Sequence, residues 1–377
     1  MNVRVPAEVF PPGEYVRDEL EARGWSQTDL AEILGRPFRL VNEIIAGKRA
    51  ITPETAKGLG EAFGTGPQFW MNLETVFRLS KAKGIEGDVS RRARIYGAAP
   101  INDMKKRHWI NGEGGVEALE GEVLGFFGVG SIEEIATLPL AAAARKGTPY
   151  AETNPSQLAW LCQVKRIACT MPVPPYREAD FDRMSIELHR LTASENEVRR
   201  VPQLLASYGV RFLVVEHLPK TRIDGAALWL DPQSPVIALS IRHDRIDAFW
   251  HTLWHELGHI KYRHATGIDD DIVGESAASR DERPEAEIVA DAFACDLLVP
   301  KIEIESFIAR VRPLYSRVRI NQFANRIQVH PGIIIGQLQH RKEIKYSQGR
   351  EMLVKIRETI VQSAVTDGWG HYPPAFL

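Results

Sequence analysis

The stretch His255-Glu256-Leu257-Gly258-His259 lies within residues 245–264, where apolar side chains recur at helical spacing. Two histidines four residues apart on a helix project from one face, so both imidazoles can bind one metal ion. The carboxylate between them can then lie beside a water on that ion. Three short segments rich in β-branched and aliphatic residues precede this helix and predict a small sheet: 210–215, 226–230 and 236–241. The order of these elements predicts an α+β metal-binding domain.

A catalytic zinc site has three protein ligands and a water, so this motif needs one more ligand. One arrangement of zinc peptidases places a glycine three residues after the second histidine and another histidine six residues after it. Tyr262 and Ala265 stand at those positions, and His264 misses by one residue. The sequence therefore excludes that arrangement and favours a carboxylate from a later helix.

The next predicted helix, 284–299, offers acidic residues for this role. Glu282 before the helix competes with Glu285 and Glu287 within it. Of these, only Glu287 is followed four residues later by a second acid, Asp291. The spacing predicts Glu287 as the third metal ligand and Asp291 as the hydrogen-bond acceptor that orients a ligand histidine.

Other polar residues around the motif have a simpler interpretation. Cys295 is predicted to be a small buried apolar residue rather than a fourth ligand. His251 lies one helical turn before His255 and is taken as an ordinary helix histidine. Nothing in the pattern marks the group that polarises a substrate carbonyl, for which His264 and Tyr262 are the candidates.

The first eighty residues predict helices joined by tight turns. Ser26 is a good N-cap for one helix, which Gly35 and Pro37 end. A second helix follows as far as Gly47, and Thr52-Pro53-Glu54 starts another with a capping threonine and a first-turn proline. Helix, short turn and helix in this register is the signature of a helix-turn-helix domain.

The second helix of this hairpin carries a mixed set of exposed candidates for binding DNA or a protein partner. Base edges are read by polar and basic side chains more than by Phe38 or Leu40, and Glu43 would oppose a phosphate. Apolar groups at this place suit a protein surface at least as well. The candidates for DNA or partner binding are Arg36, Phe38, Arg39, Asn42 and Lys48.

The chain reads as a multidomain, mainly α protein in four parts. These are a helix-turn-helix domain at 1–80, a helical connector at 81–180, an α+β zincin-like metallopeptidase domain at 181–300, and a helical region at 301–377. Residues 81–107 hold eight basic and three acidic side chains, a net +5, and a solvated connector is favoured there over a phosphate-contacting arm. Residues 322–331 and the helix after them echo residues 29–38 and their helix, and predict either a second helix-turn-helix-like hairpin or two packed helices.

Composition narrows the class of protein. The 377 residues include 47 Lys and Arg against 49 Asp and Glu, so bulk charge does not hold this chain on nucleic acid. The three cysteines form no CxxC pair, which excludes a disulfide framework and fits a reducing compartment. No segment has the about 18 consecutive apolar residues of a membrane helix, and the N-terminus lacks the apolar core of a secretory signal. We expect a cytoplasmic protein with no membrane partner.

Two family resemblances arise at these residues. The N-terminal part resembles the HigA-type antitoxin group through Pro12-Gly13-Glu14, 26–31, 44–49, 51–56 and 69–73. Residues 240–300 resemble the ImmA/IrrE metallopeptidases through Ser240-Ile241-Arg242, the histidine motif, 290–294 and 297–300. The second resemblance implies zinc-dependent cleavage of helix-turn-helix repressors, with His255, His259 and Glu287 as zinc ligands and Glu256 as the general base.

We therefore expect an endopeptidase of narrow specificity with one Zn²⁺ per chain, acting on a helix-turn-helix repressor or antitoxin-like protein. Its substrate would lie extended against an edge strand of the 210–241 sheet. The alternative is a DNA-binding regulator or antitoxin in which the zinc site is structural or sensory. Operator DNA and a toxin protein are the further partners considered, and the sequence leaves open whether the chain forms a homodimer.

Overall fold

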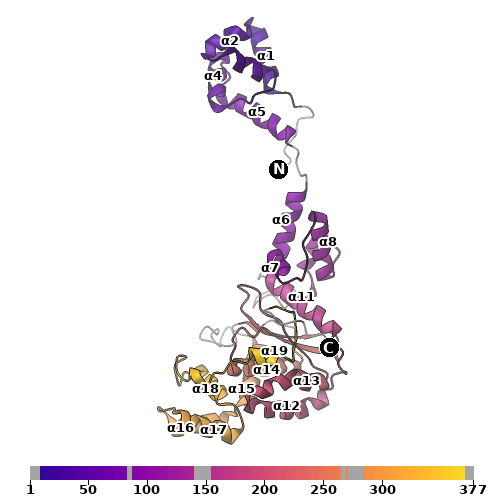
Figure 1. Cartoon of the computed structure of the whole chain (residues 1–377), viewed down its shortest axis with the longest axis vertical. Helices are drawn as coiled ribbons and strands as arrows, with labels where there is room; N and C mark the ends of the chain where they lie inside the picture. The colour runs from indigo at the N-terminus through magenta and orange to yellow at the C-terminus, as the bar shows by residue number, and fades with distance from the viewer. Residues whose placement is uncertain (1–8, 83–86, 140–153, 265–268, 271–283, 370–377) are drawn as a thin grey trace. The chain divides into compact units, whose positions relative to one another are not determined.

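A computed structural model shows the chain as two compact units, Met1–Val89 and Ser90–Leu377 (Figure 1). Each unit is described by itself. None of the helices in the described part of the chain combines the length and apolar character needed to cross a membrane. The structure describes residues 9–82, 87–139, 154–264, 269–270 and 284–369.

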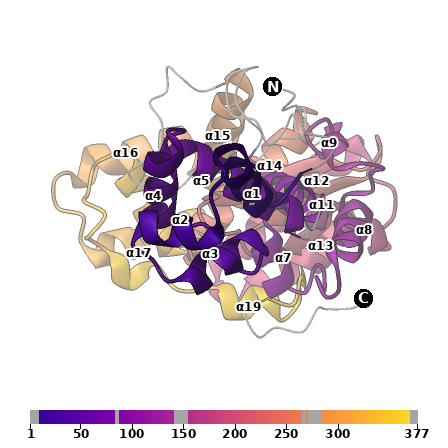
Figure 2. The same cartoon turned by 90° about the horizontal axis from the view of Figure 1, so that it is seen from above.

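Residues 9–82 of the first unit form a bundle of five helices, gathered together in Figure 2. Ser26 caps the second helix in a capping box with Asp29, and Thr52 accepts a hydrogen bond from the Thr55 amide at the start of the fourth. A Cβ at Gly13 would lie 2.3 Å from the carbonyl oxygen of Ile44, so glycine allows the first and third helices to approach closely. The helix-turn-helix prediction is confirmed, with bounds α1 Pro12–Arg23, α2 Gln27–Leu34, α3 Phe38–Ile45, α4 Pro53–Phe63 and α5 Pro67–Lys81.

A mixed five-stranded sheet with order β4-β2-β3-β1-β5 is the centre of the second unit. β1 runs parallel to β3 and β5, whereas β2 runs antiparallel to β3 and β4. The expected small sheet is confirmed, and two short strands at its edges extend it. The strands are β1 Arg211–Val214, β2 Ile223–Trp229, β3 Pro235–Leu239, β4 Asp269–Asp270 and β5 Val365–Thr366.

Side chains alternate along the strands between two hydrophobic cores, one on each face of the sheet. Phe212, Val214, Ile237 and Leu239 belong to one core, whereas their neighbours Leu213 and Ala238 belong to the other. The helices on the Leu213 face are α6 Asp88–Ala98, α7 Ile101–Lys106, α8 Val116–Phe127, α9 Ile132–Ile135 and α11 Pro155–Thr170.

Helices on the Phe212 face form the thicker layer and include the one with the histidine motif, α14 Ile246–Lys261. Its neighbour α15, Glu285–Leu298, matches the helix predicted at 284–299. The remaining elements of this layer are η1 Glu178–Asp180, α12 Phe181–Arg190, η2 Leu191–Ala193, η3 Glu195–Arg200, α13 Val201–Ser207, α16 Lys301–Val311, α17 Arg317–Ile327, α18 Pro331–His340, η5 Arg350–Met352 and α19 Arg357–Val361.

Elements from outside 181–300 contribute to the sheet and its core in the second unit. Residues of 95–135 and 158–171 belong to the core on one face of the sheet, and β5 pairs with β1 at its edge. Within the basic segment 81–107, Arg92 and Lys106 are exposed, whereas three other arginines have partners. Arg91 pairs with Glu120 and Arg94 with Glu133. Arg107 is buried and donates to the carbonyls of Glu216 and His217.

The echo of a second helix-turn-helix falls on α17 and α18, which form a hairpin with Gln328 in the left-handed conformation at the turn. Ile333, Ile334, Ile335 and Leu338 of α18 are all buried in the core next to α14. A helix buried along its length cannot enter a DNA groove. The interpretation as two packed helices is therefore the correct one.

Candidate metal centre

α14 and α15 pack closely, and this contact assembles the site. A Cβ at Gly258 would lie 3.2 Å from the Cα of Ala290, so small residues on both helices bring their backbones together. His255 is fully buried and His259 is 6 % exposed. Glu287 lies in the first turn of α15 and faces both histidines.

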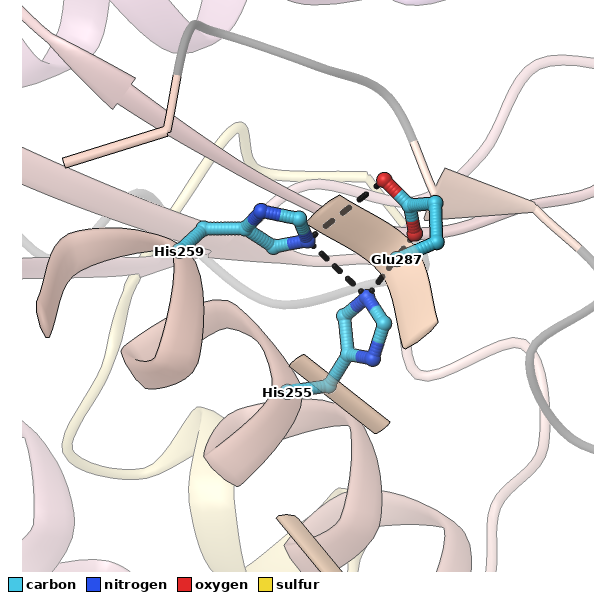
Figure 3. Close-up of side chains that lie close together, drawn as sticks. All are labelled: His255, His259 and Glu287. Atoms are coloured by element: carbon cyan, nitrogen blue, oxygen red, sulfur yellow. Dashed lines mark hydrogen bonds and ion pairs between the residues drawn. The ribbon is translucent and has the colours of Figure 1, made fainter. Parts of the chain in front are cut away.

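The predicted ligand atoms converge on one point (Figure 3). His255 Nε2 lies 3.0 Å from His259 Nε2 and 3.2 Å from Glu287 Oε2. His259 Nε2 lies 3.6 Å from Glu287 Oε1. Ligands about 2.0–2.1 Å from a tetrahedral zinc ion lie roughly 3.3–3.4 Å from one another, so these separations fit that ion. Two imidazoles, a carboxylate and an open fourth position are the donor set of a catalytic zinc site.

Each histidine ligand has a partner on its other ring nitrogen. His255 Nδ1 lies 2.8 Å from Asp291 Oδ1, and a carboxylate at this place accepts the Nδ1 proton and leaves Nε2 as the metal donor. His259 Nδ1 lies 2.9 Å from His264 Nδ1. His264 thus contacts the second predicted ligand histidine, and Tyr262 stacks on His264 with ring centroids 5.7 Å apart. Sequence reasoning had considered both residues only for polarising a carbonyl.

Hydrogen bonds to Asp291 fix its charge. Burial by itself would raise its pKa, but hydrogen bonds from His251 and His255 hold the pKa of this carboxyl well below its usual range. His251 Nε2 lies 3.7 Å from Asp291 Oδ1. Burial opposes the charged form of His251, yet hydrogen bonds with Asp291 and Cys295 raise its pKa to about 9. His251 is therefore part of the network behind the metal site rather than an ordinary helix histidine.

The Glu256 carboxylate lies between α14 and β2 and is fully buried. A Cβ at Gly225 of β2 would lie 2.3 Å from Glu256 Oε1, so the carboxylate fits only because this strand position is glycine. Sequence reasoning missed Gly225. The signal available was a glycine inside a strand pattern, which marks a bulge or a close approach. The register of β2 with β4 does shift between Ile223 and Gly225.

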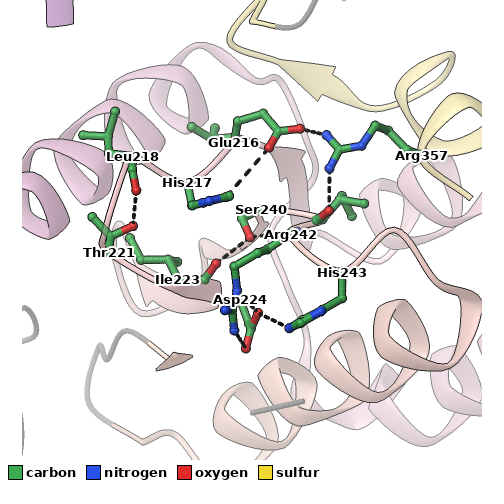
Figure 4. A network of polar contacts seen from close by, with 12 residues as sticks. Glu216, His217, Leu218, Thr221, Ile223, Asp224, Ser240, Arg242, His243 and Arg357 are labelled. Atoms are coloured by element: carbon green, nitrogen blue, oxygen red, sulfur yellow. Dashed lines mark hydrogen bonds and ion pairs between the residues drawn. The ribbon is translucent and has the colours of Figure 1, made fainter. Parts of the chain in front are cut away.

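Polar contacts join β2 to the residues that follow β3 (Figure 4). Arg242 binds Asp224 with two hydrogen bonds, of 2.9 and 3.0 Å. Ser240 Oγ donates to the Ile223 carbonyl at 2.6 Å. Ile241 adopts φ 51°, a strained conformation for a β-branched residue, and its carbonyl accepts a 2.6 Å hydrogen bond from Arg357. Ser240, Ile241 and Arg242, which carry the resemblance to the metallopeptidases, thus hold β2 in place beside Glu256.

We expect the Gly225→Ala substitution to lower activity at the metal centre while the chain still folds. The added methyl group would force Glu256 to move, and overpacking of this kind costs about 1–3 kcal/mol of stability. A cleavage assay tests this, with thermal unfolding and metal content measured beside it. Gly121→Ala in α8 is the matched control, because a Cβ there meets no atom within 4 Å. Unchanged activity in Gly225→Ala would mean that Glu256 tolerates displacement.

Two expectations about other parts of the site change with the structure. Glu282 lies outside the described residues, whereas Glu285 is exposed at the start of α15 and does not join the group of ligand atoms. The segments 210–215, 226–230 and 236–241 form interior strands of the five-stranded sheet, whose edges are β4 and β5. β4 pairs only with Ile223 and Gly225 of β2, so the pairing of a substrate with the rest of that strand stays a prediction.

The predicted binding residues of the first unit all lie on its surface. Arg36, Phe38, Arg39, Asn42 and Lys48 are exposed. The negative charge of Glu43 is balanced by ion pairs of 2.7 Å with Arg39 and 2.6 Å with Arg49, so it does not oppose phosphate as expected. Leu40 is partly buried against the helical core, whereas Phe38 is 50 % exposed.

Comparisons with known proteins match both units. A helix-turn-helix family model matches residues 16–70, and the M78 peptidase model, described as an IrrE N-terminal-like domain, matches residues 209–341. An uncharacterized HTH-type transcriptional regulator, YddM of Escherichia coli, is 31 % identical over 84 residues, which are 22 % of this chain and 88 % of that protein. Virulence-associated protein I of Dichelobacter nodosus is 38 % identical over 19 % of this chain and 68 % of its own length.

Similar solved structures match the same N-terminal segment. The Pseudomonas aeruginosa antitoxin HigA, solved with the higBA promoter, is 38 % identical, with a TM-score of 0.20 over 20 % of this chain and 83 % of that chain. An addiction module antidote protein of a HigA family from Coxiella burnetii is 38 % identical, with a TM-score of 0.19 over 19 % of this chain and 80 % of its own.

Proposed function

The chain belongs to the HTH-type transcriptional regulators through its first unit and carries an IrrE N-terminal-like domain in its second, and on this basis we propose that it is a DNA-binding regulator with zinc endopeptidase activity. The observation that carries the peptidase proposal is the convergence of His255, His259 and Glu287, together with the burial of the Glu256 carboxylate against Gly225. Each chain would hold one Zn²⁺, which would act as a Lewis acid toward a peptide carbonyl and lower the pKa of water.

The residues around the ion have distinct roles in this proposal. Asp291 and His264 hold the ligand histidines in the tautomers that present Nε2. Glu256 accepts a proton from the attacking water and delivers it to the leaving amine nitrogen. The two hydrogen bonds between Arg242 and Asp224 keep β2 against this carboxylate. Because Glu256 is buried, bulk water does not reach the proton that its carboxylate holds.

The proposed substrate is a regulatory protein, a helix-turn-helix repressor or an antitoxin-like protein. Purified zinc-loaded chain incubated with regulators encoded beside its own gene tests this by mass spectrometry of the fragments. Cleavage at one bond, abolished by a chelator and restored by zinc, is the expected result. Cleavage that continues in the chelator contradicts the assignment.

DNA binding is the second proposed activity, supported by the helix-turn-helix match and by the exposed basic side chains around α3. Phosphate contacts release counterions, so binding to operator DNA should weaken steeply as salt concentration rises. The exposed Phe38 also offers a contact for a toxin protein, which would appear as a small partner in purification.

We expect Arg36→Ala and Lys48→Ala each to weaken DNA binding and to lower the salt slope by about 1. The measurement is the dissociation constant for the promoter of its own gene at several salt concentrations. Arg17→Ala in α1 is the control, because it removes an exposed positive charge outside the α2–α3 hairpin. A salt slope equal to that of the unmodified chain in both hairpin variants would remove these residues from the DNA interface.

A further inference from the structure

The short strand β4 is paired with one end of β2. The two strands run antiparallel, with Asp270 opposite Ile223 and Asp269 opposite Gly225. In the part of the chain that the structure describes, no strand pairs with residues 226–229 on this side of β2. β4 therefore covers one end of this edge of β2 and leaves the other end without a partner strand among the described residues.

The covered end of β2 is the one that lies against Glu256. A Cβ at Gly225 would lie 2.3 Å from Glu256 Oε1, so the carboxylate packs directly on the strand at this residue. In the proposed function Glu256 takes a proton from the water that attacks the substrate, so the scissile peptide has to come within reach of this side chain. β4 thus lies next to the strand position that faces the proposed general base.

The spacing of strands decides which place an extended substrate needs. Neighbouring strands lie about 4.7–4.9 Å apart, so a substrate paired directly with β2 at Gly225 would take the place of β4. A substrate paired with the outer side of β4 would lie about 9–10 Å from β2, whereas a general base acts over about 3 Å or through one water. Only direct pairing with β2 brings the scissile peptide to Glu256. β4 and the substrate therefore compete for one place.

The pairing of β4 is short and irregular. β4 is two residues long, and its register with β2 shifts between Ile223 and Gly225, as at a β-bulge. Asp224, which lies between these two residues, is held by two hydrogen bonds from Arg242. A peptide that pairs with residues 226–229 as well would make more main-chain hydrogen bonds with β2 than β4 does. A longer extended segment can therefore replace β4.

We propose that β4 is an autoinhibitory strand, which holds the substrate's place on β2 beside Glu256 and is displaced when an extended peptide pairs with β2. This inference rests on the proposed function, because it takes Glu256 as the general base of a peptidase. It also narrows the substrate class. A partner is cleaved only where it offers an extended segment long enough to pair with residues 226–229 as well as with the covered end, which a helical segment does not.

Replacing both residues of β4 with proline tests the pairing. Successive residues of a strand point their N–H groups to opposite sides, so the double substitution Asp269→Pro/Asp270→Pro removes whichever donor faces β2. The matched control, Asp269→Asn/Asp270→Asn, removes the same two charges and keeps both N–H groups. Hydrogen exchange of the peptide that contains Ile223–Trp229 should be faster in the proline variant alone. Unchanged protection of α8 in the same experiment shows that the variant is folded.

Access to the site is measured with two hydroxamates, which bind zinc. Acetohydroxamate has no peptide backbone to pair with β2, whereas a tripeptide hydroxamate has one. The zinc-loaded proline variant should bind the tripeptide hydroxamate about fivefold more tightly than the unmodified chain or the asparagine variant, the factor that one competing main-chain hydrogen bond contributes. All three chains should bind acetohydroxamate equally.

The outcomes separate this inference from the peptidase proposal. Equal affinity of all three chains for the tripeptide hydroxamate, or unchanged hydrogen exchange of β2 in the proline variant, would overturn the role of β4. Binding of neither hydroxamate by any of the three chains would instead contradict the proposed zinc site, and the inference about β4 would fall with it.

Discussion

Replacing Glu256 with glutamine should slow substrate cleavage by about 10²- to 10⁴-fold, the range typical for loss of a general base. Glutamine keeps the shape of the side chain but cannot take a proton from water. The metal ligands and their partners Asp291 and His264 are unchanged. Zinc content should therefore stay at one ion per chain, as measured by elemental analysis beside the cleavage assay.

The same variant should fold at least as well as the unmodified chain. Glu256 is fully buried, and a neutral amide avoids the cost of burying a carboxylate. Glu285→Gln, which changes an exposed acid in the first turn of α15, is the matched control and should keep full activity. Full cleavage by Glu256→Gln with its zinc retained would show that another residue is the base.

Local signals in the sequence were enough to predict the helices and most strands. The capping residues Ser26 and Thr52 fix helix starts through hydrogen bonds to amides within three residues, so their effect is readable over a short window. The spacing of His255, His259, Glu287 and Asp291 was also readable, since side chains four apart share a helix face. Their convergence follows from the close packing of α14 on α15.

Features that depend on contacts distant in sequence were not predicted. β5 is only two residues long and pairs with β1 across about 150 positions, so no local periodicity marks it. Arg107 looked like part of a solvated basic run, yet it is buried against carbonyls of residues 216 and 217. The pattern of charges along the sequence does not show which of them will pair with distant residues once the chain folds. The connector expected at 81–180 and the helical region expected at 301–377 both contribute residues to the cores on the two faces of the sheet, which local patterns do not show.

The supporting role of His264 shows a different limit. It lies five residues after His259, and its contact needs the chain to end α14 and turn back, with Arg263 at φ 51°. The spacing of histidine side chains along a continuous helix does not predict where the chain turns back. The structure places His264 Nδ1 2.9 Å from Nδ1 of His259, one of the predicted ligands.

Substitution of a metal ligand should have the largest effect on the zinc content and thermal stability of the chain. We expect His255→Ala and Glu287→Ala to lose nearly all zinc, since only two of the three protein ligands remain in each. Asp291→Asn should keep the ion but bind it about 10- to 100-fold more weakly, because the partner of His255 no longer carries a charge. Zinc content and a competition titration measure these two effects.

Metal loss should also lower thermal stability. A ligand that binds only the folded state stabilises it by about 2.7 kcal/mol at one hundred times its dissociation constant. The unmodified chain should therefore melt at a higher temperature with zinc than with a chelator, and His255→Ala should show no such difference. Glu285→Ala, two residues from Glu287 on α15, is the control for removing an acid from that helix. It should keep the zinc ion and the higher melting temperature that zinc gives. Zinc retained in both His255→Ala and Glu287→Ala would place the ion elsewhere. If both variants lose zinc but the unmodified chain melts at the same temperature with zinc as with a chelator, the ion serves chemistry and contributes little to folding.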